Sequence, residues 1–382
     1  MKKKNNLLII GIVCIILILF AVIILSSNNS KEIKIGVIGP LSGDAAIYGR
    51  DLQNSLNYGV DEINQNGGIN GKIIKLIFED SKCNEKDALT SVQKLINIDK
   101  VNIIFGGVCS SETLGAVSIT EANKVILFSS GSSSPKISEI GNYVFRNYPS
   151  EDMLAKELAE LVYKDGYKKV AVILENQEFP VSVLEVFKKR FNELGGEIVI
   201  EQKYPPETKD YRTYLMKIKD SNADCLLFDP HNSSNGGLLV KQAKELGINL
   251  PYYGTAQLVG QEALKIAGDS INSMKVVDTP ILDKENRKAK DFLDKYYLKY
   301  EKAEIEYFIG ALYDATYIIK DAVENCKDDK DTDCIKNYLY NMPKYNGVIG
   351  SYNFDKYGDC IGINSTVRQI KDAEKGIIEI IN

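Results

Sequence analysis

Short apolar runs alternate with longer amphipathic segments along most of the chain. The run Ile33–Ile38 predicts a strand, the segment after it predicts a helix, and the run Ile73–Asp80 predicts a second strand. Further strands are predicted at 102–106, 125–129, 143–147, 169–174, 198–204 and 224–228, most of them separated from the next by a predicted helix. Strands that alternate with helices form parallel sheets flanked by helices, so the chain is expected to be of the α/β class.

Chain length and net charge limit the number of domains and the classes of partner. The chain has 382 residues, which is too long for one ordinary core and suits two α/β lobes. Its formal net charge is -5, with lysines and acids interspersed. A nucleic-acid partner usually requires a basic face, so this balance argues against that class of partner.

The first residues carry the pattern of a membrane segment. Lys2–Lys4 precede Leu7–Leu25, a run without a charged residue. The run is long enough to cross a bilayer as a helix, and the lysines before it predict a cytoplasmic N-terminus with an exported body. We therefore expect an uncleaved, single-pass N-terminal transmembrane helix within residues 1–30 that anchors the rest of the chain outside the cell.

A cleaved signal peptide is the competing interpretation of this segment. Its apolar core would be shorter, and Ser26–Asn28 is a poor substitute for the usual cleavage site of small residues. Cys14 suggests a lipoprotein site, but Gly11–Val13 before it fits that pattern badly. The uncleaved anchor is therefore the favoured interpretation.

The cysteines after the apolar run would lie in an oxidising compartment, where disulfides persist. Cys83 and Cys109 both follow predicted strands, so they are expected at the same edge of the first sheet. Cys326 and Cys334 flank an acidic loop and could close a small disulfide. A metal site is not expected, because no Cys-x-x-Cys occurs and the only histidine is His231.

One stretch near the start of the exported part is the most specific motif. It reads Gly39-Pro40-Leu41-Ser42-Gly43, then Tyr48-Gly49, then Asp61-Glu62-Ile63-Asn64, then Gly67-Gly68-Ile69-Asn70-Gly71-Lys72. This is the order strand, glycine-rich turn, helix, turn, strand. Ser42 and Tyr48 fall at the carboxyl end of the first strand, where ligands bind in open α/β sheets. The motif resembles the Leu/Ile/Val-binding branch of the solute-binding proteins that serve ABC importers.

This resemblance covers nearly all of the exported part and implies a type I periplasmic-binding-protein clamshell. Two Rossmann-like lobes would be joined by three crossovers, expected near Pro149, Thr279 and Asn353. Lobe one would comprise 31–149 plus 280–352, and lobe two 150–279 plus 353–382. Ligand is expected in the cleft between the lobes, with a hinge motion that closes on it. The resemblance also implies a disulfide between Cys83 and Cys109.

Lobe one offers donors for a ligand carboxylate. Ser110 opens the helix after the third strand, where its hydroxyl and the free N–H groups of the helix start favour an anion, although a plain N-cap is the simpler interpretation. The resemblance adds Gly131 and Ser132, which match positions that present backbone groups to the ligand. It also adds Ser133, which matches a threonine whose hydroxyl binds the ligand, and Tyr48, which matches an aromatic residue of the cleft wall.

The second lobe matches the family less well. Glu151 falls where the family often has an aspartate near the ligand ammonium, although an acid at a helix start also suits the helix dipole. Phe179 could line the cleft or belong to the core, and Asn232 falls near an aromatic cleft residue of the family. The family's acidic ammonium ligand has no counterpart near 255–257, where Gln257 is the nearest substitute. We therefore expect a small polar or different amino acid, or an amide, rather than leucine.

The leading interpretation is an anchored extracellular binding protein that delivers an amino acid or related small polar solute to an ABC permease, as a monomer without a cofactor. The alternative is a ligand-binding sensor that acts through a separate signalling partner. An enzyme on a nucleotide-binding fold is the third interpretation. It is disfavoured, because Gly-x-Gly-x-x-Gly does not follow the first strand, Gly67–Lys72 misses the P-loop spacing, and no Gly-x-Ser-x-Gly elbow occurs.

Overall fold

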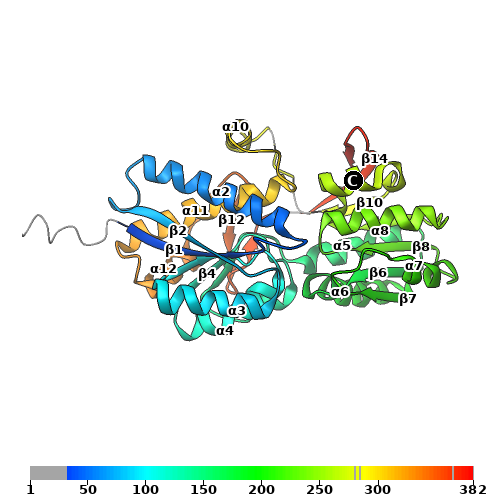
Figure 1. Ribbon diagram of the computed structural model, residues 1–382, viewed down its shortest axis with the longest axis horizontal. Helices are drawn as coiled ribbons and strands as arrows, with labels where there is room; N and C mark the ends of the chain where they lie inside the picture. Colours follow the sequence, from blue (N-terminus) through cyan, green and yellow to red (C-terminus); the bar gives the residue numbers. More distant parts are fainter. Residues whose placement is uncertain (1–31, 279–280, 284, 364, 382) are drawn as a thin grey trace, which may run out of the picture.

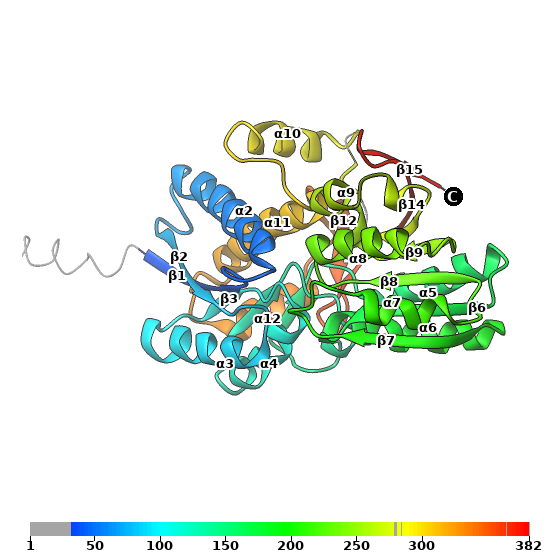
Figure 2. The same ribbon diagram turned by 45° about the vertical axis from the view of Figure 1, so that its right-hand side comes forward.

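The computed structural model describes residues 32–278, 281–283, 285–363 and 365–381. The transmembrane helix expected within residues 1–30 lies outside the described residues. None of the described helices is both long enough and apolar enough to cross a membrane. The described chain forms two α/β lobes next to each other (Figures 1 and 2), each built on its own main sheet.

The main sheet of lobe one contains five parallel strands in the order β2-β1-β3-β4-β5. Their bounds are β1 Glu32–Gly39, β2 Ile73–Asp80, β3 Ile103–Phe105, β4 Ile126–Ser129 and β5 Val144–Arg146. One face of the sheet shares an apolar core with α2 (Ala46–Gln65), α10 (Arg287–Tyr296), α11 (Glu306–Cys326) and α12 (Thr332–Asn341). The other face packs on α3 (Glu85–Lys94) and α4 (Ser110–Ala122). The inner strands β3 and β4 are buried on both faces, as expected of a parallel sheet, whereas the edge strand β2 is only partly buried.

The sheet of lobe two contains seven strands in the order β15-β14-β10-β9-β8-β6-β7. The parallel strands are β6 Lys169–Glu175, β7 Glu197–Tyr204, β8 Cys225–Asp229, β9 Tyr252–Gly254 and β10 Lys275–Asp278, and the antiparallel ones are β14 Thr366–Asp372 and β15 Ile377–Ile380. One face packs on α5 (Glu151–Lys164) and α6 (Glu178–Leu194). The other packs on α7 (Arg212–Lys219), α8 (Ser233–Glu245) and α9 (Gln261–Ala267). A short π-helix covers Leu95–Asp99, and short 3-10 helices cover Pro135–Ile137, Ala256–Val259 and Gly268–Ile271.

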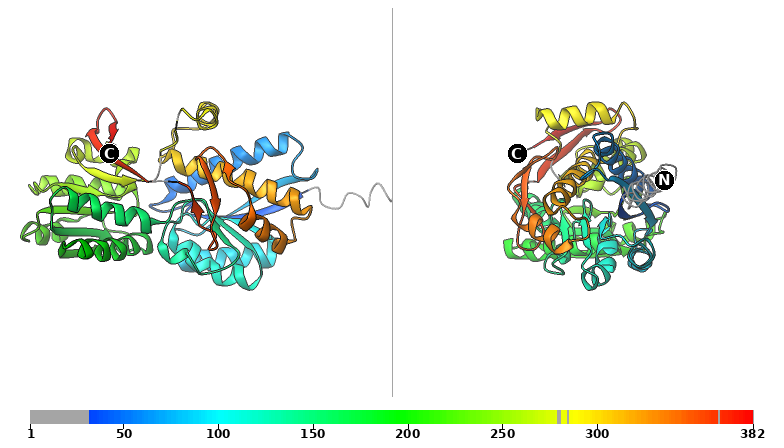
Figure 3. Two further views of the ribbon diagram at one scale, coloured as in Figure 1. Left: turned by 180° about the vertical axis from the view of Figure 1, so that it is seen from behind. Right: turned by 90° about the vertical axis from the view of Figure 1, so that its left-hand side faces the viewer.

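The third passage between the lobes lies later than expected. A small antiparallel sheet of β11 (Tyr345–Asn346), β12 (Ser351–Phe354) and β13 (Cys360–Ile361) packs on lobe one (Figure 3). The buried ring of Phe354 lies against Phe128 and Phe145 of lobe one, at centroid distances of 5.7 and 5.5 Å. The chain therefore changes lobes between β13 and β14, and the boundary expected near Asn353 is wrong.

The structure contains both disulfides considered from the sequence. Cys83 is joined to Cys109, and Cys326 is joined to Cys334. The second bridge joins the end of α11 to α12, which begins inside the stretch expected to be only a solvated loop. The thiol of Cys225 is buried and free.

The ion pair between Arg146 and Asp359 holds the small sheet to lobe one. Arg146 Nε donates to Asp359 Oδ1 at 2.5 Å, and its Nη1 donates to the carbonyl oxygen of Ser134 at 2.8 Å. The guanidinium is completely buried. The stability of the fold depends strongly on the counter-ion of a buried charge, because an unpaired ion in the interior is poorly solvated.

Removal of the carboxylate should therefore destabilise lobe one. We expect Asp359→Asn to lower the free energy of unfolding by about 3 kcal/mol, since the variant leaves Arg146 buried without its counter-ion. Asp294→Asn is the matched control, because Asp294 forms an exposed i,i+4 pair with Lys290 that contributes less than about 0.5 kcal/mol. Urea unfolding of both variants measures the difference, and equal small losses would contradict this account.

Candidate functional site

The carboxyl ends of strands from both sheets meet at a small cavity between the lobes. Lobe one lines it with residues that follow β1, β3 and β4, and lobe two with residues that follow β6, β8 and β9. The lining consists of Tyr48, Val108, Cys109, Ser110, Gly131, Ser133, Tyr148, Glu151, Phe179, His231, Gln257, Ile305 and Phe308. The cavity volume is about 50 Å³, which is well below the roughly 300–1,000 Å³ of sites for drug-sized ligands.

Polar contacts across the cleft show that the lobes are closed on one another. The hydroxyl oxygens of Tyr48 and Ser233 lie 3.1 Å apart, and the Ser233 N–H donates to Tyr48 Oη at 3.3 Å. Lys209 of lobe two pairs with Asp44 of lobe one at 2.9 Å. Ion pairs between exposed groups contribute little individually, so such contacts allow opening as well as closing.

The lobe-one end of the cavity is built from hydrogen-bond donors. Ser110 is the first residue of α4, and the N–H groups of Ser110 and Ser111 have no acceptor among the described residues. Cys109, not Ser110, occupies the N-cap position of this helix. Gly131 and Ser133 line the same end from the loop after β4. Free N–H groups at a helix start, together with hydroxyl groups, form a site for an anion.

Two of the residues expected in the site point elsewhere. The Ser132 hydroxyl donates to the carbonyl oxygen of Gly107 at 2.9 Å, and its N–H donates to Ser129 Oγ at 3.0 Å. These bonds hold the loop together inside lobe one, and Ser132 does not line the cavity. The Asn232 side chain caps α8 by accepting the Asn235 N–H at 2.9 Å, and Asn232 does not line the cavity either.

The lobe-two end of the cavity collects acceptors. Glu151, the first residue of α5, is only 4% exposed. Burial raises the pKa of its carboxyl well above the usual range, and the nearby acids Asp229 and Asp278 raise it further. Gln257 Oε1 and Asp229 Oδ2 are buried and have no hydrogen-bond partner among the described residues. The Ser133 hydroxyl donates a hydrogen bond to the Glu151 carboxyl, and the positive charge of Arg146 also acts on it, but the described lining of the cavity contains no lysine or arginine.

A family model described as periplasmic binding protein matches residues 32–373. The chain belongs to the periplasmic binding protein family. It is 26% identical over 351 residues to a leucine-, isoleucine-, valine-, threonine- and alanine-binding protein of Pseudomonas aeruginosa, an alignment that covers 90% of this chain and 91% of the relative. A Leu/Ile/Val-binding protein homologue of Brucella melitensis is 26% identical over 330 residues, with 86% and 88% covered.

Solved structures agree with this assignment. The substrate-binding protein LivJ of Streptococcus pneumoniae, in complex with isoleucine, superposes with a TM-score of 0.81 at 25% identity, covering 92% of this chain and 99% of that one. A Rhodopseudomonas palustris solute-binding protein in complex with benzoate has a TM-score of 0.82 at 18% identity, covering 92% and 96%. The resemblance to the Leu/Ile/Val-binding branch is confirmed, and the chain is a solute-binding protein of the ABC-importer type.

The cleft of this periplasmic binding protein contains residues that the sequence did not indicate. His231 is one of them, and it meets the expected cleft residue Phe179 edge to face at a centroid distance of 5.8 Å. His231 is the second residue after the end of β8, so its position at a strand end was a usable signal. Ile305 and Phe308 come from a distant segment around the start of α11, and no local pattern distinguishes them from ordinary core residues.

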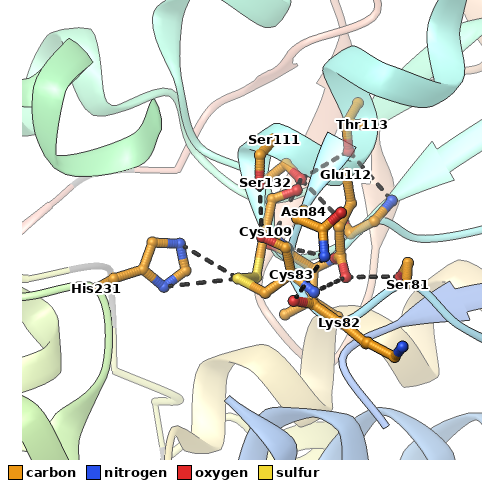
Figure 4. Close-up of a disulfide and its surroundings, with 12 residues drawn as sticks. Ser81, Lys82, Cys83, Asn84, Cys109, Ser111, Glu112, Thr113, Ser132 and His231 are labelled. Atoms are coloured by element: carbon orange, nitrogen blue, oxygen red, sulfur yellow. Dashed lines mark hydrogen bonds between the residues drawn. A yellow bond between two sulfur atoms is a disulfide. The ribbon is translucent and has the colours of Figure 1, made fainter. Parts of the chain in front are cut away.

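The disulfide Cys83–Cys109 also borders the cavity, and His231 of lobe two lies against it (Figure 4). Cys83, Cys109 and His231 together bring three potential metal ligands within 4.8 Å of one another. Cysteine binds metals as a thiolate, whereas both sulfurs here are in the disulfide. The oxidised site is therefore not suited to a metal ion.

The buried acids make the stability of the ligand-free protein depend on pH. Burial raises the pKa of Asp229 to about 8 and that of Glu175 to about 7. Between roughly pH 4 and pH 8 these two carboxyl groups bind more protons in the folded protein than in the unfolded chain, so the stability that they contribute falls as the pH rises through this range.

We expect Asp229→Asn to flatten this dependence. The variant's melting temperature should fall less than that of the wild type between pH 5 and pH 8, because the amide has no proton to lose. The exposed residue Asp220 supplies the control Asp220→Asn, which should follow the wild-type curve. Thermal unfolding at several pH values measures this, and identical slopes for all three proteins would show that Asp229 is already ionised in the fold.

Proposed function

We propose that the interlobe cavity captures a small amino acid as its zwitterion, and that the protein delivers it to an ABC permease. The observation that carries this proposal is the opposite character of the two ends of one cavity. Neutral donors gather on lobe one around Ser110 and Ser133, and the buried acid Glu151 lies on lobe two. An α-amino acid carries a carboxylate and an ammonium close together, which fits these two ends.

The lobe-one end would hold the carboxylate. The N–H groups of Ser110 and Ser111 at the start of α4, together with the Ser110 hydroxyl, can all donate to its oxygens. A positive partial charge at a helix N-terminus adds to this attraction. A carboxylate needs several donors once it leaves water, and this end supplies them without a charged side chain.

The lobe-two end would hold the ammonium. A buried carboxylate without a cation is costly and tends to take up a proton. An ammonium beside Glu151 would instead keep that carboxyl ionised, and Gln257 Oε1 could accept a second hydrogen bond. Both acceptors therefore gain a partner when a zwitterion binds.

The same arrangement argues against aromatic acids. Solute-binding proteins of Rhodopseudomonas palustris in complex with benzoate and with 4-hydroxybenzoate share the fold at 18% and 21% identity. Benzoate carries no ammonium, and the described lining of this cavity contains no lysine or arginine. An anion without a positive group would give Glu151 no cationic partner, so an amino acid fits better. The small cavity volume also favours a short side chain over that of leucine.

Glu151→Gln tests this function. Loss of a charge-assisted hydrogen bond in a desolvated site costs about 1.5–3 kcal/mol, so the affinity for glycine, alanine or serine should fall about tenfold to a hundredfold. Acetamide, which has no ammonium, should be affected much less. Glu160→Gln is the matched control on the same helix, since Glu160 is exposed and pairs with Arg190.

Isothermal calorimetry on the three proteins provides the comparison. Equal affinities of the wild type and Glu151→Gln for the amino acid would show that Glu151 serves only the start of α5. A failure of every amino acid to bind the wild type, with binding of an aromatic acid instead, would overturn the proposed ligand class.

We also propose that residues 1–30 anchor the protein at the outer face of the cell membrane. The uncharged run Leu7–Leu25 and the lysines before it support this. Peptide mapping of protein from native membranes should recover the original N-terminus. A new terminus at Ser26–Ser30, or a lipid on Cys14, would reject the uncleaved anchor.

A further inference from the structure

His231 is the only histidine of the chain, and it lies in the cleft. It occupies the loop between β8 and α8 and is 8% exposed. Its ring extends from lobe two toward the Cys83–Cys109 disulfide of lobe one (Figure 4), with Phe179 against it edge to face. The imidazole is thus part of the cavity wall opposite the disulfide.

The imidazole has an unused acceptor. Burial lowers the pKa of His231 to about 4, so the ring is neutral and has one donor nitrogen and one acceptor nitrogen. A hydrogen bond to the carbonyl of its own residue uses the donor. The other near polar contact is Cys83 Sγ, 3.7 Å from Nε2 and 3.9 Å from Nδ1. A disulfide sulfur carries no hydrogen, so it cannot donate to the acceptor nitrogen.

The ligand's charged groups leave this nitrogen free for the ligand side chain. In the proposed binding mode, donors near Ser110 and Ser133 hold the carboxylate, and Glu151 and Gln257 hold the ammonium. The Tyr48 hydroxyl is already bonded to Ser233. Neither charged group uses His231, and of the lining residues left over, Tyr148 already has an interaction of its own.

We propose that His231 accepts a hydrogen bond from a hydroxyl on the ligand's side chain, and that the cleft therefore selects small hydroxylated amino acids such as serine and threonine. This inference rests on the proposed function and narrows its ligand class. An apolar side chain of the same size leaves the buried acceptor unpaired. A site built to bond a hydroxyl discriminates against such an analogue more strongly than an apolar site discriminates against a change of shape.

Two pairs of amino acids test the inference, because each pair differs by a hydroxyl at similar size. Serine is compared with alanine, and threonine with valine, by calorimetry on the wild type, His231→Leu and His231→Gln. The wild type should bind the hydroxylated member about tenfold to a hundredfold more tightly. His231→Leu should bind both members of a pair equally, and His231→Gln, whose amide oxygen can accept, should keep part of the preference.

The possible results separate this inference from the proposed function. A wild type that binds alanine and valine as tightly as serine and threonine would overturn the role of His231 but leave the proposed function standing. If His231→Leu loses affinity for all four amino acids equally, the imidazole contacts the carboxylate or ammonium that they share. This result would also overturn the inference. A wild type that binds none of the four would overturn the proposed function, and the inference with it. Because the wild-type ratios need no variant, poor folding of His231→Leu cannot hide the outcome.

Discussion

The burial of Glu151 in the closed cleft is the constraint on which the rest of the site depends. Its carboxyl is 4% exposed, and the acids Asp229 and Asp278 raise its pKa further. Arg146 also acts on this carboxyl, but its guanidinium is bonded to Asp359 and to loop carbonyl groups. Closure without a ligand therefore leaves Glu151 either protonated or ionised with only the Ser133 hydroxyl as its side-chain hydrogen-bond partner. A ligand that brings a positive group removes that penalty, which ties closure of the lobes to the chemistry of what they enclose.

The lobe-one end of the cleft is held in place by hydrogen bonds within lobe one that do not involve the ligand. Arg146 donates a hydrogen bond to the carbonyl oxygen of Ser134. The hydroxyl of Ser132, in the same loop, donates to the carbonyl oxygen of Gly107. Glu112 accepts the N–H groups of Cys109 and Cys83 at 2.8 and 2.9 Å, so it fixes the disulfide beside the start of α4. These buried bonds hold the donor groups of Ser110 and Ser133 in place before a ligand arrives, which reduces the ordering that binding requires.

The sequence predicts the strand ends well and the loops poorly. Tyr48, Ser110, Gly131, Ser133, Glu151, Phe179 and Gln257 line one cavity, because the carboxyl ends of parallel strands meet at one edge of each sheet. Ser132 and Asn232 do not, although each is next to a residue that does. The direction of a side chain in a loop depends on bonds such as that of Ser132 to Gly107, which no periodicity encodes. The third passage between lobes was misplaced for a related reason, since the packing of Phe354 on Phe128 joins distant segments.

A crystal structure of the protein with its bound amino acid would test the central claim most directly. The account predicts the ligand between the lobes, with its carboxylate within hydrogen-bonding distance of Ser110 and Ser133 and its ammonium against Glu151. A ligand bound in the reverse orientation, or electron density for it outside this cavity, would contradict the assignment of the two ends of the cleft.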